Sequence, residues 1–467
     1  MTYSRCVMIL ADGARPDVFE ALLRAGELPH IARYIVEPGC YRRGVTSFPS
    51  TTGPAYMPFL TGCLPGTCNV PGIRWMDKTQ YRSGGLRGLR SYCSLSSYKI
   101  NADITPRVQT IFDLLPRSYN IFSAVHRGIH WRHNLTTIIR LWYWYYAHLT
   151  DRWAFIDDVA REKLTRVMAE DFQFCFAVMI GIDEYSHLDD PLGAPARARY
   201  RVLDDAVGAA AQRLQRTGRL AETLWWIVSD HGLSATDHHY CVNTFLAQHH
   251  QRPLYFPSVP RRGCTVANMM SGNGMTHLYF RHRDGWAAPV DYEYLQETTR
   301  GMFEDLLEEP AIDLLIARSR DGRVVVRRRT EEAILTERGA HIHYQARRGD
   351  PLRVGAPDLL LHREESLQQL IDGRYPDGPY QLAHLFKSPR TGDVLLTARP
   401  GYDLRLAHEE PEHHGSHGSL HRDHMVVPVL CSHPLQDIPL RTVDVFPTML
   451  QLLGRQVPDG IDGIARI

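Results

Sequence analysis

The stretch CVMILADGARPDVFEALLR, residues 6–24, decides the fold class. Its first six residues are all apolar, which is typical of a strand that is buried on both faces of a sheet. The run ends at Asp12 and Gly13, and a helical pattern follows over residues 15–24. A buried strand that leads directly into a helix is the building unit of proteins in which helices cover a parallel sheet.

The same alternation of apolar segments and helical patterns continues along the chain. It predicts an α/β fold with a mostly parallel central sheet flanked by helices on both faces, as a single domain over residues 1–467. Further strands are expected at residues 41–46, 119–125, 174–180, 224–228, 277–280, 394–398 and 426–431. Further helices are expected at residues 54–60, 195–216, 292–307 and 442–453.

Three stretches interrupt this pattern, and we expect them to be inserted cap elements at about residues 74–106, 127–161 and 312–348. In the third stretch, Asp321-Gly322 separates two β-rich runs, which predicts a hairpin. The second contains the aromatic run 142–146, WYWYY, which either packs the insertion onto the core or forms a wall for a leaving group. Because ligands bind outside the carboxyl ends of the strands, such insertions commonly carry specificity.

Composition excludes several classes of protein. Hydrophobic residues make up 44% of the chain and charged residues 22%, which is a globular balance. The net charge of +1 offers no global attraction for nucleic acid or for an anionic membrane. The longest uncharged apolar run, about residues 174–182, is too short for a transmembrane segment. No secretory signal opens the chain, and nine cysteines without a CxxC pair indicate free thiols, so we expect a cytoplasmic protein.

Three aspartates and three histidines follow the predicted apolar strands or stand in a glycine-rich loop near the C-terminus. They are Asp12, Asp183, His187, Asp230, His231 and His417. Mixed carboxylate and imidazole ligation suits Zn²⁺ best, with Mn²⁺ or Fe as alternatives. Six ligands are too many for one open catalytic metal and suit two, which can clamp the attacking and the leaving oxygen of an in-line displacement.

Thr52 is the candidate nucleophile. It is followed by Gly53-Pro54, and proline is favoured in the first turn of a helix. A hydroxyl at a helix N-terminus lies where backbone N–H groups favour an anion, and coordination to a metal would lower its pKa. The adjacent Thr51 is the alternative nucleophile.

The ordered set of motifs resembles the alkaline phosphatase superfamily, and most closely its type I phosphodiesterase/nucleotide pyrophosphatase branch. The likeness extends from residue 5 to about residue 463. It rests on Asp12-Gly13-Ala14-Arg15, Thr52 nine residues before Thr61-Gly62, Asp183-xxx-His187, Ser229-Asp230-His231-Gly232, Gly415-Ser416-His417-Gly418 and the tail from Thr442 to Gly454. The spacing to Thr61-Gly62 favours Thr52 over Thr51.

The resemblance implies an alkaline-phosphatase-like fold with two metal sites. One metal would be held by Asp183, His187 and His417, and the other by Asp12, Asp230 and His231, with Thr52 between them as ligand and nucleophile. The implied reaction is hydrolysis of a phosphodiester or pyrophosphate through a phosphothreonine intermediate. The implied substrate is a small-molecule phosphate ester, with nucleotide or lipid-linked esters as candidates, and the oligomeric state stays open.

One departure from the family pattern leaves alternatives. Nucleotide pyrophosphatases of this type carry an asparagine some twenty residues after the nucleophile, and here that stretch is Pro71–Trp75. Arg74 could bind phosphate instead, as an arginine does in phosphomonoesterases, so a phosphomonoesterase is the second interpretation. The third is a catalytically inactive binding or scaffold protein that uses the aromatic run as an interface. A sulfatase is excluded because Cys63-Leu64-Pro65-Gly66-Thr67 lacks the required arginine.

Overall fold

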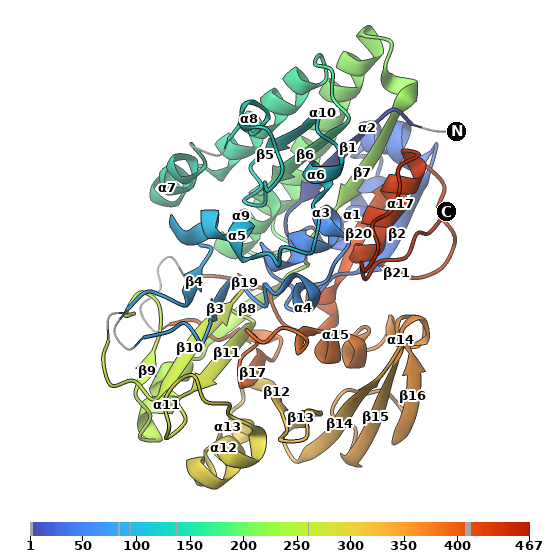
Figure 1. Cartoon of the computed structure of the whole chain (residues 1–467). Coiled ribbons are helices and arrows are strands. Elements are labelled where there is room, and N and C mark those ends of the chain that lie inside the picture. The colour runs from blue at the N-terminus through green and yellow to red at the C-terminus, as the bar shows by residue number, and fades with distance from the viewer. Residues whose placement is uncertain (1–2, 83–84, 94, 137–138, 260, 407–411) are drawn as a thin grey trace.

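The computed structural model describes the whole chain except residues 1–2, 83–84, 94, 137–138, 260 and 407–411. Two large sheets organise the described part, one in the upper and one in the lower half of Figure 1. The strand of the opening motif, β1 (Arg5–Ala11), lies in the middle of the upper sheet. It pairs in parallel with β6 (Phe174–Met179) on one side and with β7 (Thr223–Val228) on the other, and all three strands are buried apart from Arg5.

This upper sheet has seven strands in the order β21-β2-β20-β7-β1-β6-β5. The strands β7, β1, β6 and β5 run parallel, and only β20 is antiparallel to its neighbours β2 and β7. The prediction of a mostly parallel α/β sheet is therefore confirmed. The remaining strands are β2 (Cys40–Val45), β5 (Ser118–Ile121), β20 (Val426–Cys431) and β21 (Leu440–Arg441).

Helices flank the upper sheet. One layer contains α8, α9 and α10, which pack on one another, and a second contains α3, α6 and α17 (Figure 1). The bounds are α1 (Pro16–Arg24), α3 (Met57–Thr61), α6 (Ile111–Leu114), α8 (Trp153–Val167), α9 (Gly181–Leu188), α10 (Ala194–Arg216) and α17 (Val445–Leu452).

The lower sheet has nine strands in the order β16-β15-β14-β13-β12-β17-β11-β10-β9, and all neighbours are antiparallel except β9 and β10. Residues 312–348, which we expected as an inserted cap, form four adjacent strands of it, and the hairpin predicted at Asp321-Gly322 joins the first two. Their contribution to specificity stays a prediction. The strands are β9 (Pro253–Leu254), β10 (Val266–Ser271), β11 (Met275–Phe280), β12 (Ile312–Arg318), β13 (Val324–Arg328), β14 (Glu331–Arg338), β15 (His341–Arg348), β16 (Asp358–His362) and β17 (Val394–Ala398).

Two predicted elements end earlier than expected because the backbone turns left-handed. The strand expected at 119–125 stops at Ile121, since Phe122 has a φ of 65°. The helix expected at 292–307 is split into α12 (Tyr292–Thr299) and α13 (Met302–Glu308) at Arg300 and Gly301, whose φ values are 48° and 86°. A positive φ is not compatible with either a strand or a right-handed helix.

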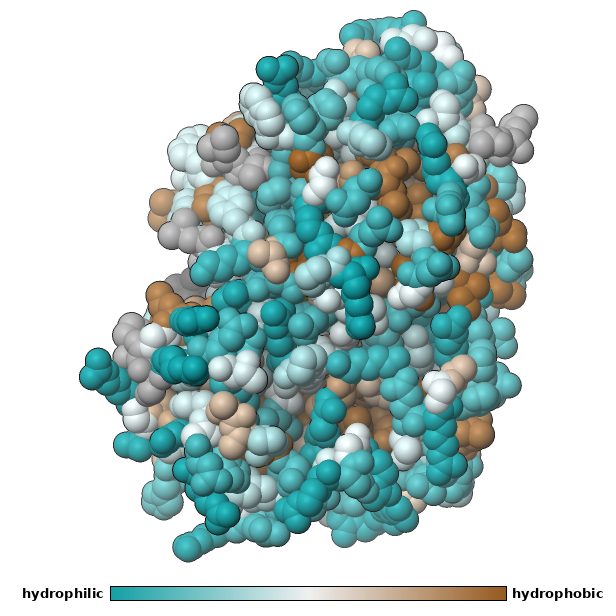
Figure 2. All heavy atoms as spheres, in the orientation of Figure 1, coloured by the Kyte–Doolittle hydropathy of each residue, from teal (hydrophilic) through white to brown (hydrophobic). Residues whose placement is uncertain are grey.

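The aromatic run 142–146 belongs to a helix, α7 (Arg140–Thr150). The face of the molecule in Figure 2 is mainly hydrophilic, and its hydrophobic residues gather towards the upper right, in the region of α17 in Figure 1.

Among the described residues, no helix has the length and apolar character needed to span a membrane. All nine cysteines are free thiols, and eight of them are buried or partly buried.

Candidate active site

The carboxyl ends of three neighbouring strands bring the predicted site residues together. Asp12 directly follows β1, and Asp230 and His231 lie just beyond β7. Asp183 and His187 lie on α9, which begins two residues after β6 ends. Because β6, β1 and β7 are adjacent and parallel, their carboxyl ends meet at one edge of the sheet, where open α/β sheets bind ligands.

Asp12, Asp230 and His231 form the first cluster of possible metal ligands. One ligand atom of each lies within 4.8 Å of the others, and all three residues are buried. His231 Nε2 is 3.4 Å from Asp12 Oδ1 and 3.4 Å from Asp230 Oδ2. The Thr52 hydroxyl reaches the same place, 3.2 Å from His231 Nε2 and 3.5 Å from Asp12 Oδ1. The Tyr56 hydroxyl also donates a hydrogen bond to Asp12 Oδ2 at 2.8 Å.

The second cluster consists of Asp183, His231 and His417, which also lie within 4.8 Å of one another. The rings of His231 and His417 are stacked with centroids 3.7 Å apart. His187, expected to join Asp183 and His417, lies beside both: its Nε2 is 3.5 Å from Asp183 Oδ1, and its ring is 5.2 Å from that of His417. All six predicted ligands are thus gathered at one place, and His231 is shared between the two clusters.

The three imidazoles are held in one orientation by backbone carbonyls. His187 Nδ1 is 2.7 Å from the carbonyl oxygen of Gly415, and His417 Nδ1 is 3.0 Å from that of Ser50. His231 Nδ1 is 3.2 Å from the carbonyl oxygen of Gly232. A carbonyl can only accept, so each Nδ1 donates. Burial lowers the pKa of all three imidazoles, so the rings are neutral and each Nε2 keeps its lone pair, which is the arrangement of a metal-binding histidine.

The electrostatics of the cluster also fit metal ions. Burial raises the pKa of Asp12 to about 6, although hydrogen bonds from Tyr56 and Thr52 counteract it. Burial, with repulsion from Asp12, raises the pKa of Asp183 and of Asp230 well above the ordinary range. Among the described residues, Asp183 Oδ1 and Asp230 Oδ2 are buried without a hydrogen bond. Orphaned carboxylate oxygens facing neutral imidazoles fit two divalent cations, because such ions compensate buried negative charge.

The two threonines differ in what their hydroxyls face. Thr52 Oγ1 contacts His231 and Asp12, as described, whereas Thr51 Oγ1 is buried and has no hydrogen-bond partner in the described part of the chain. Behind Thr52, Gly53 has a φ of 95°, and a short 3₁₀ turn, Pro54–Tyr56, leads into α3. This sharp turn presents the Thr52 side chain to the cluster.

A pocket of about 300 Å³ opens onto Thr52 and the cluster. Arg74, on β3 (Arg74–Met76), lines it and donates its Nε to Ser91 Oγ at 3.3 Å. Trp144, from the aromatic run that the sequence offered as a possible wall for a leaving group, also lines it. Further lining residues that the sequence did not assign to the site are Arg140, His148, Trp153, Glu184, Asn273 and His413. The aromatic run was the one sequence signal that pointed to part of this set. On a helix, residues four positions apart lie on one face, so Arg140 and His148 share a face of α7 with Trp144.

The lower sheet contributes to the site through the turn between β10 and β11. The Gly274 N–H donates to the His417 carbonyl at 2.7 Å, and the His417 N–H donates to the Gly272 carbonyl at 3.3 Å. These bonds fix the backbone of the loop that carries His417. The candidate site therefore lies where the two sheets meet.

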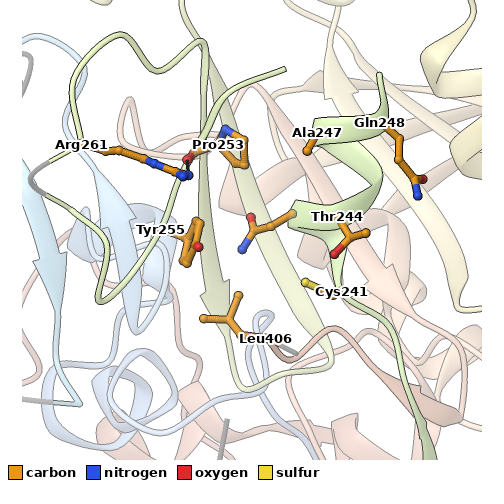
Figure 3. Close-up of a pocket in the computed structure, with 9 residues that line it drawn as sticks. Cys241, Thr244, Ala247, Gln248, Pro253, Tyr255, Arg261 and Leu406 are labelled. Carbon is orange, nitrogen blue, oxygen red and sulfur yellow. Dashed lines mark hydrogen bonds between the residues drawn. The ribbon is translucent and has the colours of Figure 1, made fainter. Parts of the chain in front are cut away.

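A larger pocket of about 490 Å³ lies elsewhere, between α11 (Val242–Gln248) and the segment that follows β9. Figure 3 shows Thr244 and Ala247 on the helix side and Tyr255 and Arg261 on the other side. None of the residues described as lining this pocket belongs to the ligand clusters. Its size alone does not make it the reaction site.

A sequence model of the family described as type I phosphodiesterase/nucleotide pyrophosphatase matches residues 6–420. No curated protein matches the chain significantly.

Solved structures resemble the whole chain. An inactive threonine-to-alanine variant of murine ectonucleotide pyrophosphatase/phosphodiesterase 5, in complex with AMP, matches with a TM-score of 0.59 and 11% identity, over 97% of this chain and 96% of that one. Phosphonoacetate hydrolase from Sinorhizobium meliloti 1021, in complex with phosphonoacetate, matches with a TM-score of 0.58 and 13% identity over the same shares. At such identities these likenesses establish the fold alone.

Proposed function

The chain belongs to the type I phosphodiesterase/nucleotide pyrophosphatase family of the alkaline phosphatase superfamily, and from that premise we propose a two-metal phosphohydrolase that cleaves a phosphodiester or pyrophosphate with Thr52 as nucleophile. The observation that carries the proposal is the position of the Thr52 hydroxyl. It lies within 3.5 Å of two of the six buried donor residues that are gathered at this edge of the upper sheet. That combination is what a metal-assisted displacement at phosphorus needs.

We assign the donors to two cations. Asp183, His187 and His417 would hold one, and Asp12, Asp230 and His231 would hold the other, with Thr52 beside the second. The mixed nitrogen and oxygen donors favour zinc, with manganese or iron as alternatives. Bound there, the cations would lower the pKa of the Thr52 hydroxyl and offset charge that develops on the phosphoryl oxygens.

The proposed reaction has two displacements at phosphorus. Thr52 Oγ1 forms a bond to phosphorus, its proton goes to solvent, and the bond from phosphorus to the leaving oxygen breaks. A water molecule then attacks the phosphothreonine, the bond between Thr52 Oγ1 and phosphorus breaks, and Thr52 regains a proton. Arg74 would bind a non-bridging oxygen through its guanidinium during both steps.

Two neighbours in the structural comparison support this proposal. The murine relative is described as inactive when one threonine is replaced by alanine, and it binds AMP. The bacterial relative binds phosphonoacetate. Both ligands carry an anionic phosphorus group and AMP is a nucleotide phosphate ester, so we propose that the pocket beside Thr52 takes a small phosphate ester of the nucleotide class.

A phosphomonoesterase is the second candidate, and Arg74 is the observation that favours it. Arg74 lines the pocket, and no acidic side chain in the described ranges forms an ion pair with it. The Nε of Arg74 donates to Ser91, and the two terminal amino groups of its guanidinium can bind phosphate oxygens, which suits a terminal, doubly charged phosphoryl group.

The test is a paired hydrolysis assay with added Zn²⁺ or Mn²⁺. Thr52→Ala should lower the rate on bis-p-nitrophenyl phosphate by at least about 1,000-fold, because removing a nucleophile removes the whole covalent pathway. Thr51→Val, which removes the neighbouring hydroxyl, should keep most of the activity. Mass spectrometry of acid-quenched enzyme should find phosphate on Thr52.

Other outcomes would change the proposal. Unchanged activity in Thr52→Ala would point to Thr51 or to direct attack by water, and a strong preference for p-nitrophenyl phosphate would favour the phosphomonoesterase. A purified protein that neither contains nor takes up a divalent metal would contradict the enzyme and favour a binding or scaffold role.

A further inference from the structure

Arg140 is a buried cation in the wall of the pocket that contains Thr52. It is the first residue of α7 and is 9% exposed. Its Nε donates to the Phe122 carbonyl at 3.0 Å, and its guanidinium carbon lies 4.2 Å from the centre of the Trp144 ring. No acidic side chain in the described part of the chain forms an ion pair with it.

The unpaired charge is costly unless something entering the pocket compensates it. Burying a charge without a counter-ion is strongly unfavourable, and an arginine stays protonated even where burial lowers its pKa, as it does here. The Trp144 ring covers one face of the guanidinium, which leaves the N–H groups at its edge for another partner. The Asp12 carboxylate attracts the charge of Arg140, but it already accepts a hydrogen bond from Tyr56 and faces the ligand cluster.

A second guanidinium lines the same pocket. Arg74 comes from β3, a different element from α7, and it too lacks an acidic partner among the described residues. Glu184 and Asp151 also line the pocket, yet neither forms an ion pair with Arg74 or Arg140. The pocket therefore presents two separate guanidinium groups to whatever binds beside Thr52.

We infer that Arg140 and Arg74 together bind anionic oxygens of the substrate, and that the enzyme prefers substrates with at least two negative charges on phosphorus groups over singly charged diesters. Guanidinium groups match phosphate oxygens in pairs of parallel hydrogen bonds, and two of them suit two charges. A dianionic phosphate monoester and a pyrophosphate-linked ester both provide this chemistry. The inference deepens the proposed function and rests on it for the reaction itself.

The test compares three substrates in the metal-loaded enzyme. These are p-nitrophenyl phosphate, which is dianionic, ADP-ribose, which contains a pyrophosphate, and bis-p-nitrophenyl phosphate, which carries one charge. Arg140→Gln should lower kcat/KM about 10- to 100-fold for one or both of the doubly charged substrates, since a hydrogen bond to a charged group is lost, and less than about threefold for the singly charged diester. A loss of kcat/KM confined to p-nitrophenyl phosphate would indicate that the arginines bind a terminal phosphoryl group. A loss confined to ADP-ribose would indicate that they bind the second phosphate of a pyrophosphate.

Matched variants separate binding from structural support. Arg132 also stacks on an indole, with its guanidinium carbon 5.2 Å from the centre of the Trp131 ring, but it is exposed, so Arg132→Gln should leave all three rates unchanged. Arg140→Lys keeps the positive charge but loses the paired N–H groups of the guanidinium, so it should restore part of the preference for doubly charged substrates. If Arg140 serves only to hold the backbone at Phe122 through its hydrogen bond to that carbonyl, its variants will lower all three rates by the same factor. That result would overturn the inference.

A binding measurement keeps the inference distinct from the proposed function. Inorganic phosphate is titrated calorimetrically into zinc-loaded Thr52→Ala, with and without Arg140→Gln, and the second change should raise Kd at least about tenfold. If this holds while the native protein hydrolyses none of the three substrates, the proposed reaction fails and the anion site stands. If hydrolysis depends on Thr52 but Arg140→Gln alters neither Kd nor substrate preference, the inference fails and the reaction stands.

Discussion

Asp157 shows how a single buried carboxyl can make stability depend on pH. It lies on α8, is 1% exposed, and accepts the Gly181 N–H through Oδ1 at 3.1 Å. Burial raises its pKa to about 7, while that hydrogen bond and the charge of Arg199 act in the opposite direction. The pKa of Asp157 is higher in the folded state than in the unfolded state. Below about pH 4 the carboxyl is protonated in both states and does not affect stability. Above about pH 4 the folded state loses stability as the pH rises, and the loss is complete above about pH 7.

Asp157→Asn should therefore stabilise the protein more as the pH rises. A pKa of about 7 in place of the ordinary value near 4 corresponds to roughly 4 kcal/mol at pH 8. We therefore expect the gain in unfolding free energy at pH 8 to exceed the gain at pH 5 by about 2 kcal/mol or more. Urea denaturation at both values measures this. Asp158→Asn, at an exposed neighbour that pairs with Arg161, is the control and should change little. Equal effects of Asp157→Asn at the two pH values would contradict the argument.

The sequence allowed the six donor residues to be chosen because each is tied to a local pattern. Asp12, Asp183 and Asp230 end apolar runs, and strand ends converge in an α/β sheet whatever the rest of the chain does. Arg140 carries no such pattern. Its importance depends on how α7 packs against Phe122 and on which acids lie nearby, and these are tertiary facts that a local motif does not contain.

At the scale of elements, the turn between β10 and β11 supports the site from the lower sheet. Gly272 has a φ of 69°, and a Cβ there would come within 2.7 Å of His417 Nδ1, the atom that bonds to the Ser50 carbonyl. Gly272→Ala should displace the imidazole and weaken the proposed zinc binding about 10- to 100-fold, as loss of an outer partner of a metal ligand does. Competition with a chelating dye measures the affinity.

A second hairpin glycine in the same sheet provides the control for that prediction. Gly322, between β12 and β13, has a φ of 83°, but a Cβ there would meet nothing within 4 Å. Gly322→Ala pays a similar backbone penalty, about 1 kcal/mol, and should leave zinc affinity unchanged. If the two variants weaken zinc binding equally, the effect comes from backbone strain and not from contact with His417.

The strands β1, β6, β7 and β20 of the upper sheet were predictable because they are almost continuously apolar. The lower sheet was predicted only in part. In β14 and β15, buried and partly exposed residues alternate, and the strands pair in a meander whose register is set by neighbours. Patterns of that kind indicate a hairpin but do not show which sheet it joins. The split between α12 and α13 was missed because Arg300, an ordinary helix former, takes up a left-handed conformation.

At the scale of the whole molecule, a buried network of charges links the two sheets. Arg441, on the edge strand β21 of the upper sheet, bonds to both carboxylate oxygens of Asp377 at 2.7 and 2.9 Å and to Glu364 at 3.1 Å. Asp377 precedes α15 (Gly378–Leu385) and Glu364 lies on α14 (Arg363–Leu370), the helices that follow the lower sheet's β16. Arg466 near the C-terminus joins Glu364 to Asp444. Because these bonds join elements of both halves of the molecule, we expect the network to help fix the position of one sheet relative to the other.

Asp377→Asn tests whether this network stabilises the molecule. Asparagine tolerates the left-handed φ of 57° at this position, so the change removes the charge without straining the backbone. Arg441 is 3% exposed and would keep only Glu364 as a carboxylate partner, which should lower the unfolding free energy by about 2 kcal/mol or more. Asp372→Asn, which breaks an ion pair to Arg422 at a side chain that is 90% exposed, should cost less than about 1 kcal/mol. Urea denaturation measures the unfolding free energy of both variants. If Asp377→Asn and Asp372→Asn lower it equally, the buried Asp377 pair contributes no more to stability than an exposed ion pair.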